Sequence, residues 1–413
     1  MPPLPKFLTG GETARAASLL KAGEIVALPT ETVYGLAADA LNADAVRRIF
    51  DAKGRPLLDP LIVHLADAAR LGEIAEPSPA ALALAERFWP GPLTLVLRRK
   101  PVVPDIVTAG LPTVAVRCPA HPLMRRVLEQ SGLFLAAPSA NPFGYVSPTT
   151  AAHVRDSLGE RCPWILDGGP CEHGVESTIV LLENGGTGGG GDGSGTGTGG
   201  VRARLLRPGP VPWEEIAAVL AGMQGGDGSD GALEGDGQQG GGQVGDLPRP
   251  MRVGDPRSQG APPALPVTDD AARPVAPGML SRHYSPRTPL TLHAPNAMPP
   301  ATPPNEARLW QRRPENTTGE GNNRATGETG VHTGATGGDF WFSETGAPSE
   351  VARNVFALLR RLDTAGYTRI HVELAPDSPL APAINDRLRR AAATGSADFQ
   401  VGSTPPCGAA ATS

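Results

Sequence analysis

Residues 28–64 read LPTETVYGLAADALNADAVRRIFDAKGRPLLDPLIVH, and this stretch decides the fold that we expect. Short apolar segments stand at its two ends, Ile25–Leu28 and Leu61–His64, and both are typical of buried strands. Between them, apolar side chains recur at helical spacing from Ala45 to Ala52. The pattern predicts an α/β domain built from strands and amphipathic helices.

Polar side chains gather where these elements end. They are, in chain order, Thr30, Glu31, Thr32, Tyr34, Lys53, Arg55 and His64. The ends of elements are where α/β proteins build their binding sites. Because the set combines cations, hydroxyls and a histidine without an obvious nucleophile, it predicts a site that binds and orients an anionic substrate.

The composition limits the classes of protein to which the chain can belong. Its 413 residues, 40% of them hydrophobic, suffice for two or three domains with real cores. The net charge of −5 gives no general attraction to nucleic acid, which disfavours an RNA-coating role. The four cysteines include no Cys-x-x-Cys pair, which argues against a disulfide framework or a zinc ribbon and favours a reducing, cytoplasmic location. The first residues lack a long apolar run, so we expect no secretory signal and no membrane anchor, while an organelle leader stays open.

Alternating strands and helices continue along the first half of the chain and predict one α/β domain over residues 8–222. A glycine-rich insertion at residues 184–200 contains a formal G-x-G-x-x-G match. We reject that match as a dinucleotide fingerprint because no amphipathic helix follows it, and we expect a flexible hairpin insertion instead.

The second half begins with a Gly/Pro-rich linker, predicted over residues 223–286. Its last part, APGMLSRHYSP at 276–286, is too dense in functional side chains to be a spacer, and the linker is long enough for it to return to the first domain. A smaller α/β unit is predicted over residues 287–400, with a disordered insertion at about 294–338 in which RLWQ is a candidate strand. Residues 401–413 are expected to be a tail.

More candidate site residues follow later strands. Arg117 ends the segment TVAVR and Arg207 ends ARLLR. Each alone could be a surface arginine, but together with the two cations after the first helix they would make an anion site able to hold a triphosphate. Ser139 and Asn141 follow the apolar segment FLAAP, where such side chains also commonly cap the next turn.

Several common chemistries find no support in the sequence. The segment Cys171–Glu176 contains potential metal ligands, but its spacing fits no standard zinc pattern. The chain has no G-x-x-x-x-G-K-[ST] motif, so any nucleotide is bound without a P-loop. It also has no G-x-S-x-G nucleophile elbow.

With these residues in view, the chain resembles the threonylcarbamoyl-AMP synthase family in its long form. The matching blocks span residues 24 to 286 in the family's order: PTETVYGLAADA, KGRP with PLIVH, FWPGPLTLVL, TVAVRCPAHP, AAPSAN, SPTTA, GVESTIV, LLRPGPV and APGMLSRHYSP. The resemblance implies a YrdC-type twisted mixed-sheet domain with helices and a smaller Rossmann-like α/β C-terminal domain.

The resemblance also implies an activity. Such an enzyme combines L-threonine, bicarbonate and ATP, with Mg²⁺ on the triphosphate, into threonylcarbamoyl-adenylate and pyrophosphate. The product would pass to the threonylcarbamoyl-transfer machinery that acts on tRNA. We therefore expect nucleotidyltransferase chemistry, no membrane partner and at most weak RNA binding.

Matching motifs assign roles to individual residues. The threonine pocket would comprise Thr32, His64, Arg117, Ala137 and Ser177. The nucleotide would be held by Lys53, Arg55, Thr113, Ser139, Asn141, Ser147 and Arg207, with Lys53 and Arg55 as the catalytic charges. The linker would supply Arg282, His283 and Tyr284 to cover the site. One departure is Asp59, where the family usually has Asn. A carboxylate near phosphates is unfavourable unless it faces magnesium or solvent, so its role stays open.

Two other functions are consistent with parts of the sequence. A related domain performs carbamoyl transfer in hydrogenase maturation, although this chain lacks the zinc-finger and acylphosphatase-like segments that accompany it there. A double-stranded RNA-binding module with a local basic surface is the alternative outside enzymes.

Overall fold

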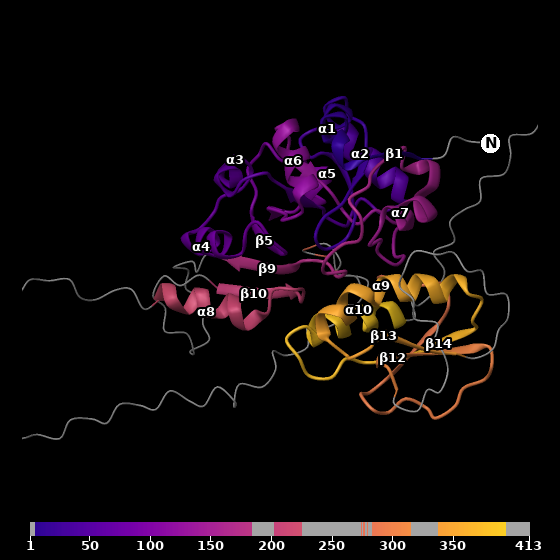
Figure 1. Cartoon of the computed structure of the whole chain (residues 1–413). Coiled ribbons are helices and arrows are strands. Elements are labelled where there is room, and N and C mark those ends of the chain that lie inside the picture. The colour runs from indigo at the N-terminus through magenta and orange to yellow at the C-terminus, as the bar shows by residue number, and fades with distance from the viewer. Residues whose placement is uncertain are drawn as a thin grey trace, which may run out of the picture.

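The computed structural model describes residues 5–183, 202–224, 274, 276, 279, 283–314 and 338–393. They form a ten-stranded mixed sheet and a separate four-stranded parallel sheet, each with helices packed on it (Figure 1). The predicted fold class, a mixed-sheet α/β domain with a smaller Rossmann-like one, is confirmed. The glycine-rich insertion, most of the linker and the tail lie outside the described residues.

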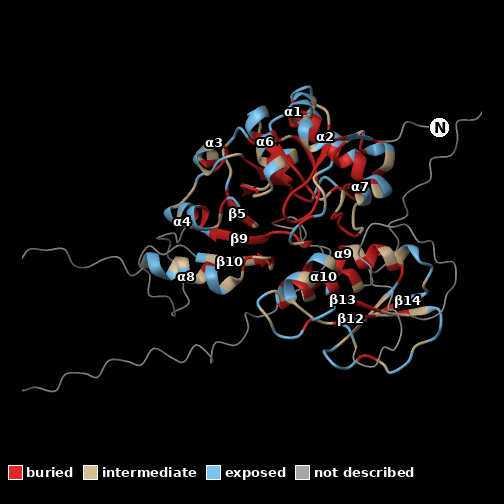
Figure 2. Cartoon of the chain, viewed as in Figure 1, coloured by how far each residue is buried: buried red, intermediate tan, exposed pale blue. Residues whose placement is uncertain are grey.

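The larger sheet has the order β1-β8-β2-β3-β7-β4-β6-β5-β9-β10. Its strands are β1 (Lys6–Leu8), β2 (Val26–Leu28), β3 (Gly35–Asp39), β4 (Ile62–His64), β5 (Leu93–Arg98), β6 (Thr113–Arg117), β7 (Leu135–Ala136), β8 (Trp164–Leu166), β9 (Thr178–Glu183) and β10 (Arg202–Arg207). Its helices are α1 (Thr13–Lys21), α2 (Ala43–Lys53), α3 (Leu71–Ile74), α4 (Pro79–Phe88), α5 (Asp105–Thr108), α6 (Pro122–Ser131), α7 (Ala151–Leu158) and α8 (Trp213–Gln224). Figure 2 shows that the strands at the centre are buried.

The stretch 28–64 differs from the expectation in one respect. Residues Gly35–Asp39 form β3, which pairs antiparallel with β2. The sequence GLAAD gave no strand signal because glycine and alanine have low strand propensity and the segment is buried without alternation. Residues 29–34, most of them polar, are therefore the connection of a β-hairpin, and they are buried.

Helix α2 has clear start and stop signals. The Asn42 side chain accepts hydrogen bonds from the backbone N–H groups of Asp44 and Ala45, both at 3.1 Å. At the other end Gly54 takes a left-handed conformation with φ of 62°, which glycine adopts at little cost. This C-terminus fixes Lys53 as the last helical residue and sends the chain directly to Arg55.

The smaller domain consists of β11 (Leu290–His293), β12 (Glu306–Arg312), β13 (Asp339–Ser343), α9 (Pro348–Thr364), β14 (Arg369–Glu373) and α10 (Ala381–Ala392), with strand order β11-β14-β12-β13. The candidate strand RLWQ lies within β12. Both helices lie on the side of this sheet that faces the larger domain (Figure 1).

A single apolar cluster crosses the interface between the two domains. Val33, Val146 and Val175 of the larger domain belong to the same buried cluster as Phe356 of α9. Close backbone approach adds to it, because a Cβ on Gly174 would lie only 2.4 Å from the Arg353 Cα atom. The two domains therefore share one continuous buried interface beside the strand ends. None of the helices in the described part of the chain has the length and apolar character needed to cross a membrane.

Candidate functional site

A small cavity of about 50 Å³ lies where the β2–β3 connection meets the ends of the central strands. Among the predicted site residues, those that line it are Thr32, Arg55, His64, Arg117, Ala137, Ser139, Ser177, Arg207, His283 and Tyr284. Both halves of the predicted site thus meet in one place. The lining also includes Thr30, which belonged to the polar set at the element ends but received no individual role, and Glu176, which was not assigned to this site from the sequence.

One side of the cavity is built around Arg117. The parallel register of β4 and β6 pairs His64 with Arg117 at the strand ends. The Arg117 guanidinium donates to Thr32 Oγ1 at 3.0 Å and to the Gly91 carbonyl at 3.2 Å, while its Nη2 lies 2.6 Å from Glu31 Oε1. Since a fixed guanidinium beside hydroxyls is suited to a carboxylate, this side can bind the carboxylate of an amino acid.

The ionisation states on this side follow from burial and from Arg117. Burial would raise the pKa of Glu31, but the neighbouring guanidinium outweighs it and holds that pKa below its usual value. Burial, with Arg117 adding to it, lowers the pKa of His64 to about 3. His64 is therefore a neutral imidazole at physiological pH, and its Nδ1 has no hydrogen-bond partner among the described residues.

On the opposite side, Arg55 faces the cavity and is paired with Asp59, the position at which the family usually has Asn. Arg55 Nη2 lies 2.8 Å from Asp59 Oδ2 and donates to the Pro60 carbonyl at 2.8 Å. Both side chains are almost fully buried. Burial raises the pKa of Asp59, while Arg55 and Lys53 oppose that rise. Asp59 therefore neutralises a cation that would otherwise be available to a phosphate.

Lys53 takes a different place from the one its motif suggested. It does not line the cavity, and its Nζ donates to the backbone carbonyls of Ser139 and Asn141, both at 2.5 Å. The Asn141 side chain in turn donates to the Tyr145 carbonyl at 2.8 Å. In this state Lys53 and Asn141 hold the loop that presents Ser139 to the cavity.

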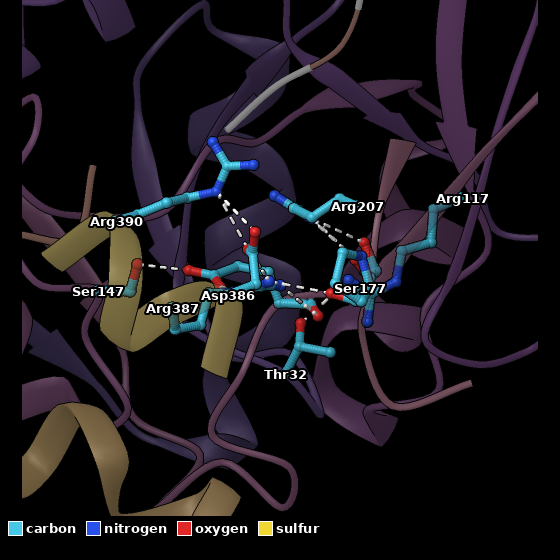
Figure 3. Close-up of polar contacts among 10 residues, drawn as sticks. Thr32, Arg117, Ser147, Ser177, Arg207, Asp386, Arg387 and Arg390 are labelled. Atoms are coloured by element: carbon cyan, nitrogen blue, oxygen red, sulfur yellow. Dashed lines mark hydrogen bonds and ion pairs between the residues drawn. The ribbon is translucent and has the colours of Figure 1, made fainter. Parts of the chain in front are cut away.

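Ser177 and Arg207 form a third wall, drawn in Figure 3. Arg207 donates to the Ser177 carbonyl at 3.0 Å and to its hydroxyl at 3.1 Å. The Ser177 and Thr94 hydroxyls lie 2.8 Å apart. Ser147 stands behind this wall and donates to Glu176 Oε1 at 2.6 Å. Glu176 precedes Ser177 in the GVESTIV block, and that adjacency was the sequence signal that placed it near the site.

The remaining predicted residues lie elsewhere. Thr113 starts β6, at the opposite end of that strand from Arg117, and does not line the cavity. Arg282 falls outside the described residues. The described part of the chain holds no group of three or more His, Cys, Asp or Glu side chains able to bind a metal.

His283 and Tyr284 reach the cavity from the linker and lie against the smaller domain. Their rings are 4.1 Å apart, and the Tyr284 ring lies 5.4 Å from Phe356 of α9. The His283 N–H donates to the Arg390 carbonyl of α10 at 3.4 Å. Tyr284 has φ of 64°, and its buried hydroxyl has no hydrogen-bond partner among the described residues. A strained backbone and an unpaired buried hydroxyl at a cavity wall are typical of a ligand-binding segment.

Comparison with known proteins shows which protein family the chain matches. Residues 18–187 match a family model described as "Telomere recombination", and residues 214–393 match one described as "Threonylcarbamoyl-AMP synthase, C-terminal domain".

Two curated relatives extend over nearly the whole chain. The threonylcarbamoyl-AMP synthase of Bacillus subtilis is 36% identical over 386 residues, covering 92% of this chain and 93% of its own. The protein of that name from Pyrococcus abyssi is 35% identical, covering 91% and 92%. Among solved structures, that of P. abyssi Sua5 complexed with L-threonine superposes with a TM-score of 0.67 at 31% identity, covering 94% of this chain and 97% of that one.

Proposed function

Because this chain belongs to the threonylcarbamoyl-AMP synthase family, we propose that it makes threonylcarbamoyl-adenylate from L-threonine, bicarbonate and ATP, with release of pyrophosphate. The observation that supports this most directly is the meeting of two unlike half-sites in one cavity. Thr32, His64 and Arg117 form one of them, and we assign it to threonine. Arg55 and Arg207 face the same cavity and suit phosphates.

The reaction needs positioning and neutralisation of charge. The threonine amino group and bicarbonate would first give a carbamate and water. A carbamate oxygen would then attack the α-phosphorus of ATP, and the bond from that phosphorus to the pyrophosphate oxygen would break. Arg55 and Arg207 would offset the charge that builds up on the phosphates, in a site where water is largely excluded. No covalent intermediate with the protein is required, consistent with the absence of an activated nucleophile among the residues that line the cavity.

Magnesium would accompany the triphosphate. Mg²⁺ in nucleotide sites is usually held by phosphate oxygens and one or two carboxylates; Glu176 lines the cavity, and Asp59 pairs with the lining residue Arg55. The described residues offer no larger cluster of ligands, which fits a metal that arrives with ATP. We further propose that the adenylate is passed to the machinery that modifies tRNA.

The cavity is partly open, and its volume is about 50 Å³. His283 and Tyr284 line it and pack against the smaller domain, so this segment borders the space in which the substrates would bind.

The test is pyrophosphate release from ATP in the presence of bicarbonate and a panel of amino acids. We expect release with L-threonine and little with serine or valine. Omission of bicarbonate should abolish it. Release that does not depend on threonine would refute the proposed function.

A further inference from the structure

One arginine of the smaller domain is completely buried against the backbone that positions Ser177 and Arg207. Arg387 lies in α10, and its side chain has 0% exposure. Its Nη1 donates to the Pro208 carbonyl at 2.9 Å, and its Nη2 donates to the Glu176 carbonyl at 3.2 Å. These two residues are the immediate chain neighbours of Arg207 and Ser177. A single guanidinium therefore joins both segments of that wall.

The same guanidinium also fixes a carboxylate in the cavity wall. Arg387 Nε donates to Glu176 Oε2 at 2.8 Å, while the other carboxylate oxygen accepts from the Ser147 hydroxyl at 2.6 Å. Asp386 accepts from Arg387 Nη1 at 2.8 Å and from Arg390 Nε at 2.9 Å, which holds the guanidinium from within its own helix. A buried pair with so many hydrogen bonds restricts its members to one arrangement.

Through Pro208 these contacts reach Arg207 of the nucleotide side, and through Glu176 they reach Ser177, which the resemblance assigns to the threonine pocket. Arg387 does not line the cavity, so it acts through its neighbours. The Ser177 hydroxyl has a second partner, Thr94, within the larger domain. On the threonine side, the hydrogen bond from Arg117 to Thr32 also lies within the larger domain. Loss of Arg387 should therefore displace the nucleotide side more than the threonine side.

We propose that Arg387 is a positioning residue for the nucleotide half-site, through which the smaller domain forms part of the adenylation site. This rests on the proposed function. Misplacement of a reacting group by about 1 Å can reduce a rate about a hundredfold, so an indirect contact of this kind can matter as much as a direct one. Lysine should replace Arg387 poorly, because an ammonium lacks the planar fork that reaches several acceptors at once.

The experiment compares Arg387→Ala and Arg387→Lys with a matched interface variant. Arg353→Ala is the control, because Arg353 also crosses the interface, donating to the Glu172 carbonyl at 2.9 Å, but among the described residues it makes no hydrogen bond to one that lines the cavity. Dissociation constants for a non-hydrolysable ATP analogue and for L-threonine are measured separately by calorimetry on the full chain, and kcat/KM for ATP is measured alongside.

We expect Arg387→Ala to weaken binding of the ATP analogue about tenfold or more and binding of L-threonine less than about threefold. The affinities of Arg387→Lys should lie between those of Arg387→Ala and the natural chain. Arg353→Ala should change neither constant by more than about twofold. An equal loss of affinity for both ligands would indicate general damage to the site and overturn the proposal. So would an unchanged affinity for the ATP analogue in a folded variant.

Removal of Arg387 alone leaves Glu176 buried and unpaired, which could prevent folding. In that case Arg387→Met combined with Glu176→Gln leaves no unpaired charge and gives the same readout, with Glu176→Gln alone as its reference. If the natural chain releases no pyrophosphate with threonine, the proposed function fails, while the two binding constants still decide the role of Arg387.

Discussion

Replacement of Arg117 by methionine should destabilise the larger domain as well as remove threonine binding. Arg117 and Glu31 lie 2.6 Å apart, and each side chain is only 4% exposed. Removing one partner of a buried ion pair costs about 3–5 kcal/mol, because the remaining charge has lost its compensation. For a domain of this size each kcal/mol lowers the melting temperature by about 2–4 °C, so we expect a fall of roughly 6–20 °C.

The assay is calorimetry of the full chain, following the unfolding transition of the larger domain. The matched control is Arg87→Met, since Arg87 and Glu215 form an exposed pair, 3.8 Å apart with exposures of 63% and 53%. Such a pair contributes about 0–1 kcal/mol, so that variant should melt close to the natural chain. The double variant Arg117→Met/Glu31→Gln should recover a large part of the loss, because no charge is left buried.

Lowering the pH should narrow the difference in melting temperature between Arg117→Met and the natural chain. In the natural chain the pKa of Glu31 is lowered, so its contribution to stability is present above the unfolded pKa and is lost as the pH falls through the folded pKa. Without Arg117, burial raises that pKa, and protonation of Glu31 relieves the variant as the pH falls through the raised pKa. A single variant that melts within about 3 °C of the natural chain, or a double variant no more stable than the single one, would refute the reasoning.

Three further changes test the other side of the site and the histidine. Arg55→Ala should raise the KM for ATP roughly ten- to hundredfold, since a charge-assisted hydrogen bond contributes about 1.5–3 kcal/mol; steady-state kinetics with unchanged KM would remove Arg55 from the site. Asp59→Asn should tighten binding of the ATP analogue in the absence of magnesium, because it removes a carboxylate that competes with phosphate for Arg55; calorimetry showing equal or weaker binding would contradict this. Because burial lowers the pKa of His64 to about 3, the unfolded chain binds the extra proton first and the natural chain loses stability as the pH falls from about 6.5 toward 3. His64→Gln should show a smaller loss over that range in melting experiments, and equal losses would rule out the linkage.

Much of the site could be predicted from the sequence because strand ends are recognisable and their neighbours in the sheet converge. His64 and Arg117 each end an apolar run, and parallel pairing of β4 with β6 places them side by side. Ser139 and Ser177 likewise follow or begin buried strands. Family resemblance supplied the roles, but local patterns alone already indicated an anion site at these strand ends.

Other features depend on contacts that no local pattern contains. The strand β3 has neither alternation nor strand-forming residues, and only its burial between β2 and β7 makes it a strand. In the sequence, Glu176 was a potential metal ligand in a segment whose spacing fits no standard zinc pattern. Its partner Arg387 lies 211 residues later, so no local pattern reveals the pair. Lys53 was placed on the phosphates, whereas here the carbonyls of a distant loop accept its hydrogen bonds.

The buried carboxylates beside the site arginines have different consequences for the two substrates. A guanidinium has five N–H groups, and the contacts of Arg117 with Gly91, Thr32 and Glu31 involve each of its nitrogens once. The second N–H on each Nη can then meet a carboxylate, so Glu31 orients Arg117 without occupying all its donors. Arg55 differs in arrangement, because its Nη2 contacts both Asp59 and the Pro60 carbonyl, so its two remaining N–H groups are both on Nη1. The threonine carboxylate can therefore bridge the two Nη atoms of Arg117, whereas a phosphate meets Nη1 of Arg55 alone, and the Asp59 charge repels that phosphate unless a cation or a proton neutralises it.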